Sequence, residues 1–265
     1  MKVTVEQNRI ERLLGKKTSG LLSVYYTAGF PTYEDTVRIG EQLSDQGADI
    51  IEIGIPFSDP VADGPVIQMS NKLALEQGMT LSLLLSQVKI LRTKTEVPLI
   101  LMGYLNPLLQ FGMEAFCREA KEAGVDGVII PDLPLTEYQQ MYQSLFESHG
   151  LYNIFLVSPT TSDERIRQID DASHGFIYAV SSSSTTGSKN EFTEAQLSYF
   201  KRLKELNLKH PFLIGFGIHN DKTFKAACEH SAGAIIGSAF ISELSNSTDL
   251  ENDIGKFVKN IKGTV

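Results

Sequence analysis

The sequence lacks the features of a secreted or membrane-bound protein. Its 265 residues include only two cysteines, Cys117 and Cys228, which stand far apart in expected helices. This spacing is typical of free thiols in a cytoplasmic protein and not of a disulfide framework. No run approaches the ~18 apolar residues that a membrane-spanning helix requires. The first residues contain no apolar core of signal-peptide length. We therefore expect a cytoplasmic protein with no membrane partner.

Positive charge is also scarce. Lys and Arg number 24 against 32 Asp and Glu, which gives a formal net charge of −8 and a pI of about 5.2. Nucleic-acid binding depends on basic residues that neutralise phosphates. The composition therefore argues against a nucleic-acid partner, although it allows a local pocket for a small anion. No linker divides the chain, and we expect one domain over residues 1–265.

Motifs of metal and cofactor chemistry are missing. The five histidines are scattered, without an H-x-H or H-E-x-x-H pattern and without a Cys–His cluster, so a metal site is not expected. No G-x-G-x-x-G follows the first expected strand, which removes the usual dinucleotide signal. The expected strand ends carry no lysine for a Schiff base, and Lys189 lies in a loop. These residues therefore predict no metal site, no dinucleotide site of the usual kind and no Schiff base.

Short, continuously apolar segments recur along the chain, with helical segments between them. Such runs are typical of strands buried on both faces of a parallel sheet. Eight strand–helix units predict a closed (β/α)8 barrel, the TIM barrel, with a doubly wound open sheet as the alternative. The expected strands cover residues 21–27, 49–54, 98–103, 127–130, 152–157, 175–180, 212–216 and 234–237.

Extra helices are expected outside the regular strand–helix units. An amphipathic segment at about residues 4–14 could cap the bottom of the barrel. The roughly forty residues between the second and third strands are enough for two helices, because an average helix is about 11–12 residues long. Pairs that match or approach a capping box, and so predict helix starts, are Thr32 with Asp35, Thr136 with Gln139, and Thr193 with Gln196.

The segment IEIGIPFSDPVADGP, residues 51–65, places carboxylates where a barrel enzyme has its active site, at and after the end of a strand. If the isoleucines beside Glu52 face the helices, Glu52 points into the barrel mouth, where apolar walls raise its pKa and make it a proton donor or acceptor. Asp63, from a Pro- and Gly-rich loop, can stay ionised and take a different role. Asp59, directly before Pro60, is typical of an Asx turn.

Glycine and hydroxyl residues follow the later strands. The segments IGFGI (214–218) and IIGSAF (235–240) make Gly217, Gly237 and Ser238 candidates for binding a phosphate through backbone N–H groups. The segment SSSSTTGS (181–188) follows the sixth strand and is a candidate lid, whose hydroxyls could close onto a carboxylate of the strand-two loop.

These residues resemble the tryptophan synthase alpha chain family. The segment IEIGIPFSDPVADG agrees with the family signature at each position, and TAGFP, PDLP, GFGI and GSA extend the resemblance over essentially the whole chain. The resemblance implies a lyase that cleaves indole-3-glycerol phosphate to indole and glyceraldehyde 3-phosphate by a retro-aldol reaction. It implies that Glu52 protonates indole C3 and takes the proton of the glycerol hydroxyl nearest the ring. It also implies that Asp63 accepts a hydrogen bond from the indole N–H.

The resemblance also implies substrate-binding residues. Tyr178 matches an active-site tyrosine of the family, and Tyr25 stands where an aromatic residue contacts indole. Thr186 is kept, so its hydroxyl is expected to reach Asp63. Ser184 and Thr185 replace a Gly and a Val of the family, so the resemblance does not predict how fast the loop closes. The positions that match phosphate-binding residues are Gly187, Gly217, Gly237 and Ser238.

A partner follows from the same resemblance. The family alpha chain docks on a pyridoxal-phosphate beta chain in an alpha2beta2 complex, and loop 56–62 lies where the family touches that partner. Pyridoxal phosphate is expected only on the beta chain. Two alternatives remain at this point: another phosphosugar barrel enzyme, such as an indole-glycerol-phosphate-forming synthase or a flavin-dependent barrel, and a non-catalytic subunit that only activates its partner.

Overall fold

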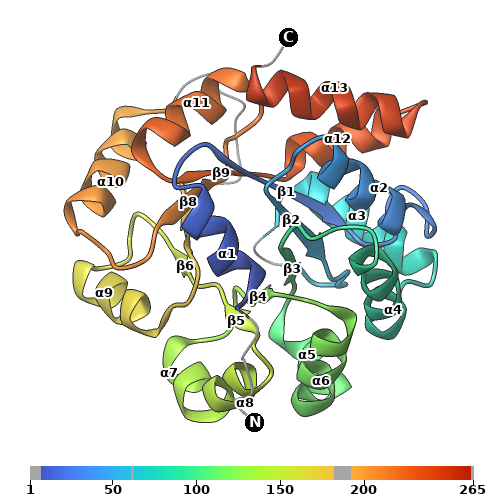
Figure 1. Cartoon of the computed structure of the whole chain (residues 1–265), viewed down its shortest axis with the longest axis horizontal. Helices are drawn as coiled ribbons and strands as arrows, with labels where there is room; N and C mark the ends of the chain where they lie inside the picture. Colours follow the sequence, from blue (N-terminus) through green and yellow to red (C-terminus); the bar gives the residue numbers. More distant parts are fainter. Residues whose placement is uncertain (1–6, 61–62, 182–191, 264–265) are drawn as a thin grey trace.

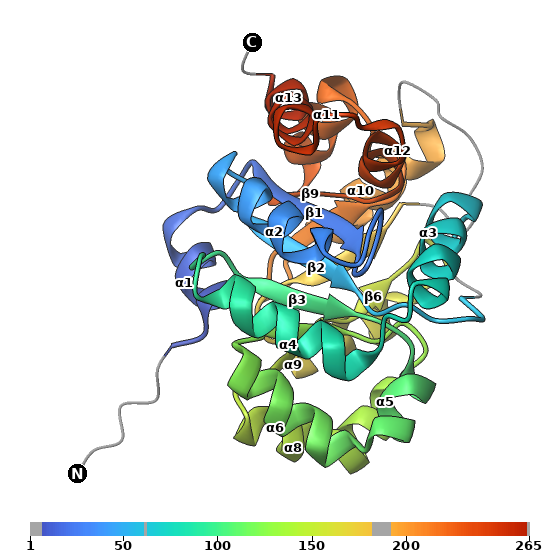
Figure 2. The same ribbon diagram turned by 90° about the vertical axis from the view of Figure 1, so that its right-hand side faces the viewer.

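The computed structural model describes residues 7–60, 63–181 and 192–263. Figures 1 and 2 show parallel strands at the centre and helices around them. The strands are β1 Leu21–Thr27, β2 Ile50–Gly54, β3 Leu99–Met102, β4 Gly127–Ile129, β5 Tyr152–Asn153, β6 Leu156–Val157, β7 Ile177–Val180, β8 Phe212–Gly215 and β9 Gly233–Ile236. Their order in the sheet is β5-β4-β3-β2-β1-β9-β8-β7-β6.

Helices lie between the strands. They are α1 Arg9–Lys16, α2 Asp35–Asp45, α3 Pro65–Glu76, α4 Leu81–Arg92, α5 Leu105–Phe111, α6 Met113–Ala123, α7 Leu135–Glu137, the π-helical turn η1 Tyr138–Tyr142, α8 Gln143–Ser148, α9 Asp163–Ala172, α10 Glu194–Glu205, α11 Asp221–His230, α12 Ser238–Asn246 and α13 Leu250–Lys262. The two expected helices between the second and third strands are α3 and α4. None of the helices within the described ranges is long and apolar enough to cross a membrane.

The fifth expected strand closes the barrel. Over residues 152–157 it forms two short segments, of which β5 pairs with β4 and β6 pairs with β7. Between them, Ile154 N donates to Val128 O at 2.8 Å, and Tyr178 N donates to Phe155 O at 2.9 Å. The ring is therefore continuous, the (β/α)8 barrel is confirmed, and the open-sheet alternative is wrong.

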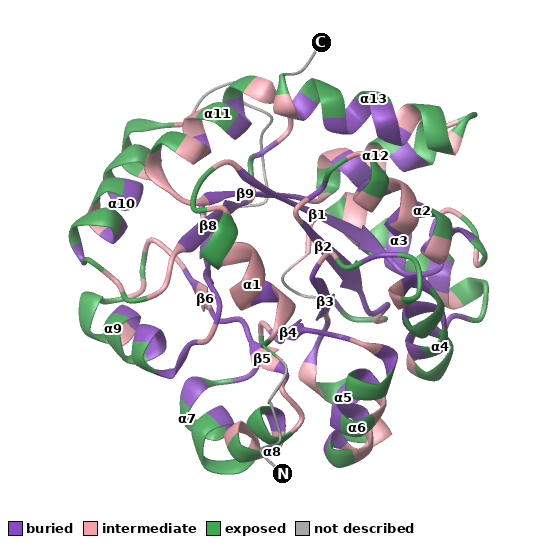
Figure 3. Cartoon of the chain, viewed as in Figure 1, coloured by how far each residue is buried: buried purple, intermediate pink, exposed green. Residues whose placement is uncertain are grey.

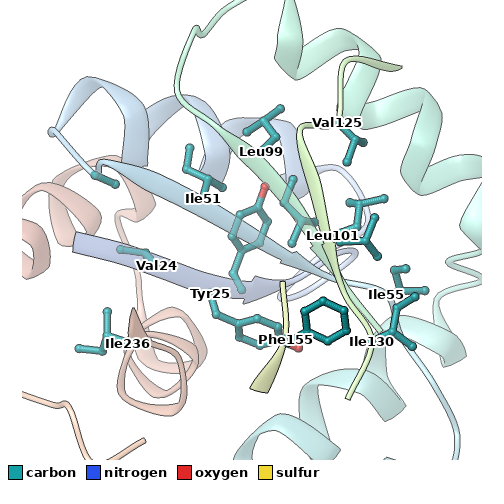
Figure 4. Packing of buried hydrophobic residues seen from close by; sticks show 14 of the residues in the cluster. Val24, Tyr25, Ile51, Ile55, Leu99, Leu101, Val125, Ile130, Phe155 and Ile236 are labelled. Atoms are coloured by element: carbon teal, nitrogen blue, oxygen red, sulfur yellow. The ribbon is translucent and has the colours of Figure 1, made fainter. Parts of the chain in front are cut away.

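The strands are buried on both faces, as their continuous apolar composition predicts. Figure 3 shows this buried centre inside helices whose outer faces are exposed. A larger cluster joins the outer face of the strands to the helices, and Figure 4 shows part of it. The barrel interior holds a second cluster, made of Ile10, Leu21, Ile50, Ile100, Ile129, Ile154, Phe176, Tyr178, Leu213 and Ile235.

Helix α1 covers the N-terminal end of the barrel, and Figure 1 shows it over the barrel centre. Ile10 is fully buried in the interior cluster. Asn8 Nδ2 donates to the backbone oxygens of Asp126 at 2.8 Å and Gly150 at 3.0 Å, just before β4 and β5. The expected cap at the barrel bottom is thus confirmed, but the helix spans Arg9–Lys16 instead of about residues 4–14.

Only one of the three expected helix starts is correct. Thr193 caps α10 in a full capping box with Gln196. Helix α2 begins at Asp35, because the Thr32 hydroxyl donates to the Asp35 carboxylate at 2.7 Å and caps no backbone N–H. Helix α7 begins at Leu135 with Pro134 at the N-cap, so the Thr136 prediction is also wrong.

Candidate active site

Glu52 lies inside the barrel and is the middle residue of β2, Ile50–Gly54. Its neighbours Ile51 and Ile53 pack in the cluster that contacts the helices, and the side chain of Glu52 is fully buried. Oε1 accepts a hydrogen bond from Ser23 Oγ at 2.7 Å, whereas Oε2 has no partner among the residues that the structure describes. Burial raises the pKa of Glu52 to about 7, and the Ser23 hydrogen bond opposes this rise. Both protonation states are therefore populated near neutral pH.

Asp63 lies in the loop between β2 and α3, one residue before the helix N-cap Gly64. The Tyr104 hydroxyl donates to Asp63 Oδ2 at 3.3 Å. Burial raises the pKa of Asp63 to about 6, and the Tyr104 hydrogen bond lowers it. At pH 7 the carboxylate is therefore mostly ionised, so the two acidic groups have different protonation equilibria, the pattern that assigns acid and base roles in other enzymes.

Two tyrosines lie beside the carboxylates. Tyr25 and Tyr178 are buried, with 7% and 5% of their surface exposed. Burial raises the pKa of both hydroxyls, and the negative charges of Asp63 and Glu52 raise them further. These four side chains, from β1, β2, β7 and the loop after β2, are thus within electrostatic range of one another. Figure 4 shows Tyr25 on its strand.

Glycines on the neighbouring strands make room for the tyrosine rings. A Cβ at Gly54 of β2 would overlap Tyr25 Oη, and a Cβ at Gly215 of β8 would overlap Tyr178 Oη. Each ring therefore lies across the adjacent strand at a place that only glycine leaves open. Sequence reasoning did not single out these two glycines, although both stand at strand ends.

The candidate phosphate residues lie at the ends of β8 and β9. Gly217 follows β8 with a φ of +79°, a conformation that favours glycine. Gly237 is the N-cap of α12, whose first residue is Ser238, and no side chain caps this helix. The first backbone N–H groups of α12 therefore suit an anion. A Cβ at Gly237 would lie 3.3 Å from the Tyr25 ring, so this helix end adjoins the tyrosine.

Thr186 and Gly187 lie outside the described residues, so the structure does not place them. Ser181 and Phe192, which flank residues 182–191, are described, and both lie next to Gly217. A Cβ at Gly217 would be 3.7 Å from Ser181 Oγ and 4.0 Å from the Phe192 ring. Ser181 Oγ also donates to Phe216 O at 2.6 Å, which holds the end of β7 against the residue that follows β8.

Two residues that bind the carboxylates were missed by sequence reasoning, Ser23 and Tyr104. Ser23 precedes Tyr25 by two residues on β1 and so shares its face of the strand. That alternation is the signal that could have found it. Tyr104 is 6% exposed, follows β3, and packs against Phe57 with ring centroids 5.2 Å apart. No sequence pattern relates Tyr104 to Asp63, because the contact depends on the path of the strand-two loop.

The fold and these groups define a (β/α)8 barrel with two carboxyl groups of raised pKa in its candidate site. Among the described side chains, no group of three or more His, Cys, Asp or Glu could hold a metal ion. The model of the family described as "Tryptophan synthase alpha chain" matches residues 12–264. This chain belongs to the tryptophan synthase alpha chain family.

Relatives and solved structures agree with this assignment over nearly the full length. The tryptophan synthase alpha chain of Christiangramia forsetii is 53% identical over 255 residues, 96% of this chain and 98% of the relative. That of Bacteroides thetaiotaomicron is 48% identical over 255 residues, 96% of this chain and 100% of the relative. Tryptophan synthase subunit alpha from Legionella pneumophila superposes with a TM-score of 0.87 and 37% identity over 97% of this chain and 98% of that one. A tryptophan synthase structure from Mycobacterium tuberculosis superposes with a TM-score of 0.88 and 29% identity over 97% of this chain and 98% of that one.

Proposed function

We propose that Glu52 and Asp63 are the two catalytic groups of this tryptophan synthase alpha chain. As a member of that family, the protein is a lyase of tryptophan biosynthesis that cleaves indole-3-glycerol phosphate to indole and glyceraldehyde 3-phosphate in a retro-aldol reaction. The observation that carries the residue assignment is the buried Glu52 carboxyl, whose pKa of about 7 lets it give and take a proton at neutral pH.

The chemistry of the cleavage explains why two unlike carboxyl groups are needed. Protonated Glu52 gives its proton to indole C3, which makes the ring an acceptor for the electron pair of the bond that will break. The substrate's glycerol hydroxyl nearest the ring then loses its proton to Glu52, and its oxygen forms the carbonyl of the product. The electron pair of the broken carbon–carbon bond returns to the indole ring. Ionised Asp63 accepts from the indole N–H and stabilises the positive charge that develops there.

The remaining site residues bind the substrate. Tyr25 and Tyr178 form the walls for the indole ring, supported by their burial beside both carboxylates. The phosphate is bound by backbone N–H groups at Gly217 and at the uncapped start of α12, Gly237 and Ser238. Gly187 joins that site, and the Thr186 hydroxyl reaches Asp63, as the resemblance implies.

A beta chain completes the enzyme. We infer an alpha2beta2 complex in the cytoplasm, with pyridoxal phosphate bound by the beta chain and none bound by this chain. Loop 56–62 is the expected contact with that partner. Indole passes from the alpha site to the beta site without release.

The test of the catalytic assignment is Glu52→Gln, which keeps the shape of the side chain and removes the transferable proton. Indole release should fall by roughly 10³-fold or more, in the upper part of the range for general acid–base groups, while an unreactive indole-bearing alkyl phosphate still binds. Glu96→Gln, an exposed change at the opposite end of the barrel, is the matched control and should leave turnover intact. Near-normal cleavage by Glu52→Gln would end the assignment.

Two further outcomes separate the remaining proposals. If wild-type chain releases no indole yet still activates a beta chain, the non-catalytic alternative holds. For the phosphate site, Gly237→Val should raise the KM for indole-3-glycerol phosphate, because the new side chain stands at the N-cap of α12 and meets the Tyr25 ring. Equal binding of a phosphate analogue to this variant would place the phosphate elsewhere.

A further inference from the structure

A chain of buried hydroxyl groups joins strand β1 to helix α3 beside the carboxylates. The Thr27 and Ser70 hydroxyl oxygens are 2.7 Å apart, and Ser70 Oγ donates to Ile67 O at 2.9 Å. Tyr25 Oη lies at the other end, 3.5 Å from Thr27 Oγ1. Thr27 and Ser70 are fully buried. The short bond between Thr27 and Ser70 is therefore a water-free link between the barrel wall and the helix.

The hydroxyl groups of Thr27 and Ser70 depend on each other. Either of them can be the donor of the bond between them. When Ser70 gives its one proton to Ile67 O, Thr27 is the donor. Loss of the Thr27 hydroxyl would leave Ser70 without this partner inside the protein, and a buried polar group without its partner costs about 1–3 kcal/mol.

Asp63 lies two residues before the helix that this link holds. Helix α3 begins at Pro65, and its N-cap Gly64 offers no side chain to fix the first turn. Gln68 Nε2 donates to the backbone oxygen of Asp63 at 2.8 Å, which couples the aspartate to that turn. A shift of the first turn of α3 relative to β1 therefore moves Asp63 relative to Tyr25 and Glu52.

We propose that Thr27 and Ser70 are positioning residues that set the place of Asp63 in the site. They touch no reacting atom and act through the first turn of α3. This inference rests on the proposed function, in which Asp63 is the anion at the indole nitrogen.

The variant that tests it is Thr27→Val, which keeps the shape and removes the hydroxyl. The kcat should fall by about tenfold to a hundredfold, because a misplacement of about 1 Å in a reacting group can cost this much. KM should change less than kcat, because the phosphate residues lie after β8 and at the start of α12, and the contact of Thr27 with the Tyr25 hydroxyl, at 3.5 Å, is long. Thr27→Ser restores the hydroxyl and should recover most of the rate. Ser70→Ala should lower kcat in the same direction.

A matched control separates positioning from simple loss of stability. Ser44 Oγ and Thr95 Oγ1 form a similar hydroxyl pair, 2.6 Å apart, with Thr95 buried away from the site. Thr95→Val should lower the free energy of unfolding to a similar extent as Thr27→Val and leave kcat unchanged. A parallel loss of kcat in both variants would contradict the proposal.

The decisive experiment combines Thr27→Val with Asp63→Asn and measures single-turnover cleavage. If Thr27 acts through Asp63, its substitution has little further effect once the carboxylate is gone, so the two losses do not multiply. Losses that multiply would show that Thr27 acts independently of Asp63 and would overturn the inference. Normal turnover of Asp63→Asn alone would instead overturn the proposed function. If Thr27→Val does not fold, Ser70→Ala completes the same cycle.

Discussion

Buried carboxylates lie at both ends of the barrel, but their partners differ. At the N-terminal end, the Asp126 carboxylate accepts from Arg92 at 2.8 Å and from Arg9 at 3.3 Å. At the C-terminal end, the hydrogen bonds that the structure gives to the carboxylates of Glu52 and Asp63 come from hydroxyl groups.

The difference shows how one fold holds acidic groups for two purposes. Burial raises the pKa of Asp126, and the two arginines beside it oppose that rise and keep the ion pair together. At Glu52 and Asp63 the group that opposes the effect of burial is a neutral hydroxyl, and burial raises their pKa values to about 7 and about 6. Carboxylates with cationic partners stabilise the barrel bottom, and those with hydroxyl partners are able to exchange protons at its mouth.

The largest expected effects come from the same substitution made at each end. Asp63→Asn removes the anion that we propose at the indole nitrogen, and kcat should fall by about 10²–10³-fold, the usual effect of losing one preorganised electrostatic partner. Asp126→Asn leaves the half-buried Arg92 without its anion, whereas Arg9 keeps its ion pair with Glu96, and the free energy of unfolding should fall by at most about 3–5 kcal/mol.

Steady-state kinetics and urea unfolding of both variants would test this contrast. Asp63→Asn should unfold close to the wild-type midpoint, and Asp126→Asn should keep its kcat per folded molecule. The comparison breaks down if Asp126→Asn lowers kcat as much as Asp63→Asn does.

Glu52→Gln should make stability less dependent on pH. The pKa of Glu52 is about 7 in the folded chain and near 4.5 when unfolded. The folded state therefore binds the extra proton between these values, and wild-type stability falls as pH rises from about 4.5 to 7. The stability advantage of Glu52→Gln should be absent below pH 4.5 and reach at most about 3 kcal/mol above pH 7, since one pKa unit is about 1.4 kcal/mol. Urea unfolding at pH 5 and pH 8 would measure it, and equal differences at both values would contradict it.

Gly54→Ala should disturb the indole pocket more than the fold. The added methyl group overlaps Tyr25 Oη and pushes the ring across the site. Overpacking of this kind costs about 1–3 kcal/mol, and we expect it chiefly as a higher KM. Gly15→Ala, at a glycine that like Gly54 has no left-handed φ and that has no atom within 4 Å of the new methyl group, is the control for the glycine substitution itself. A KM unchanged by Gly54→Ala would show that Tyr25 does not contact the substrate.

Ser23→Ala should have the smallest effect. The Ser23 hydrogen bond lowers the pKa of Glu52 against the effect of burial, so its loss should raise that pKa further. The pH profile of kcat should shift upward, with only a modest loss of rate at its maximum. A profile that stays in place would show that Ser23 does not control the protonation of Glu52.

The sequence was sufficient to predict the barrel and the side of the strand on which the Glu52 side chain lies. Continuous apolar runs predict the strands, and strand alternation predicts that Glu52 points away from Ile51 and Ile53. Contacts between strands could not be predicted in this way. Ser23 contacts Glu52, and Gly54 receives Tyr25, because of the register between β1 and β2. A single sequence does not specify that register.

Loop geometry accounts for the other residues that sequence reasoning missed. Tyr104 reaches Asp63 across 41 positions of sequence, and Thr27 reaches Ser70 across 43. The wrong helix start at Thr32 has a similar cause, since its hydroxyl is bound to the Asp35 side chain and not to the backbone.

The central claim is that a neutral hydroxyl partner leaves the buried Glu52 able to exchange its proton near neutral pH. Carbon-13 NMR of chain labelled at the glutamate carboxyl carbons tests it most directly, with the Glu52 signal assigned by its loss in Glu52→Gln. The account predicts a titration midpoint near pH 7, which Ser23→Ala moves higher. A midpoint close to the ordinary value of 4.5 would contradict it.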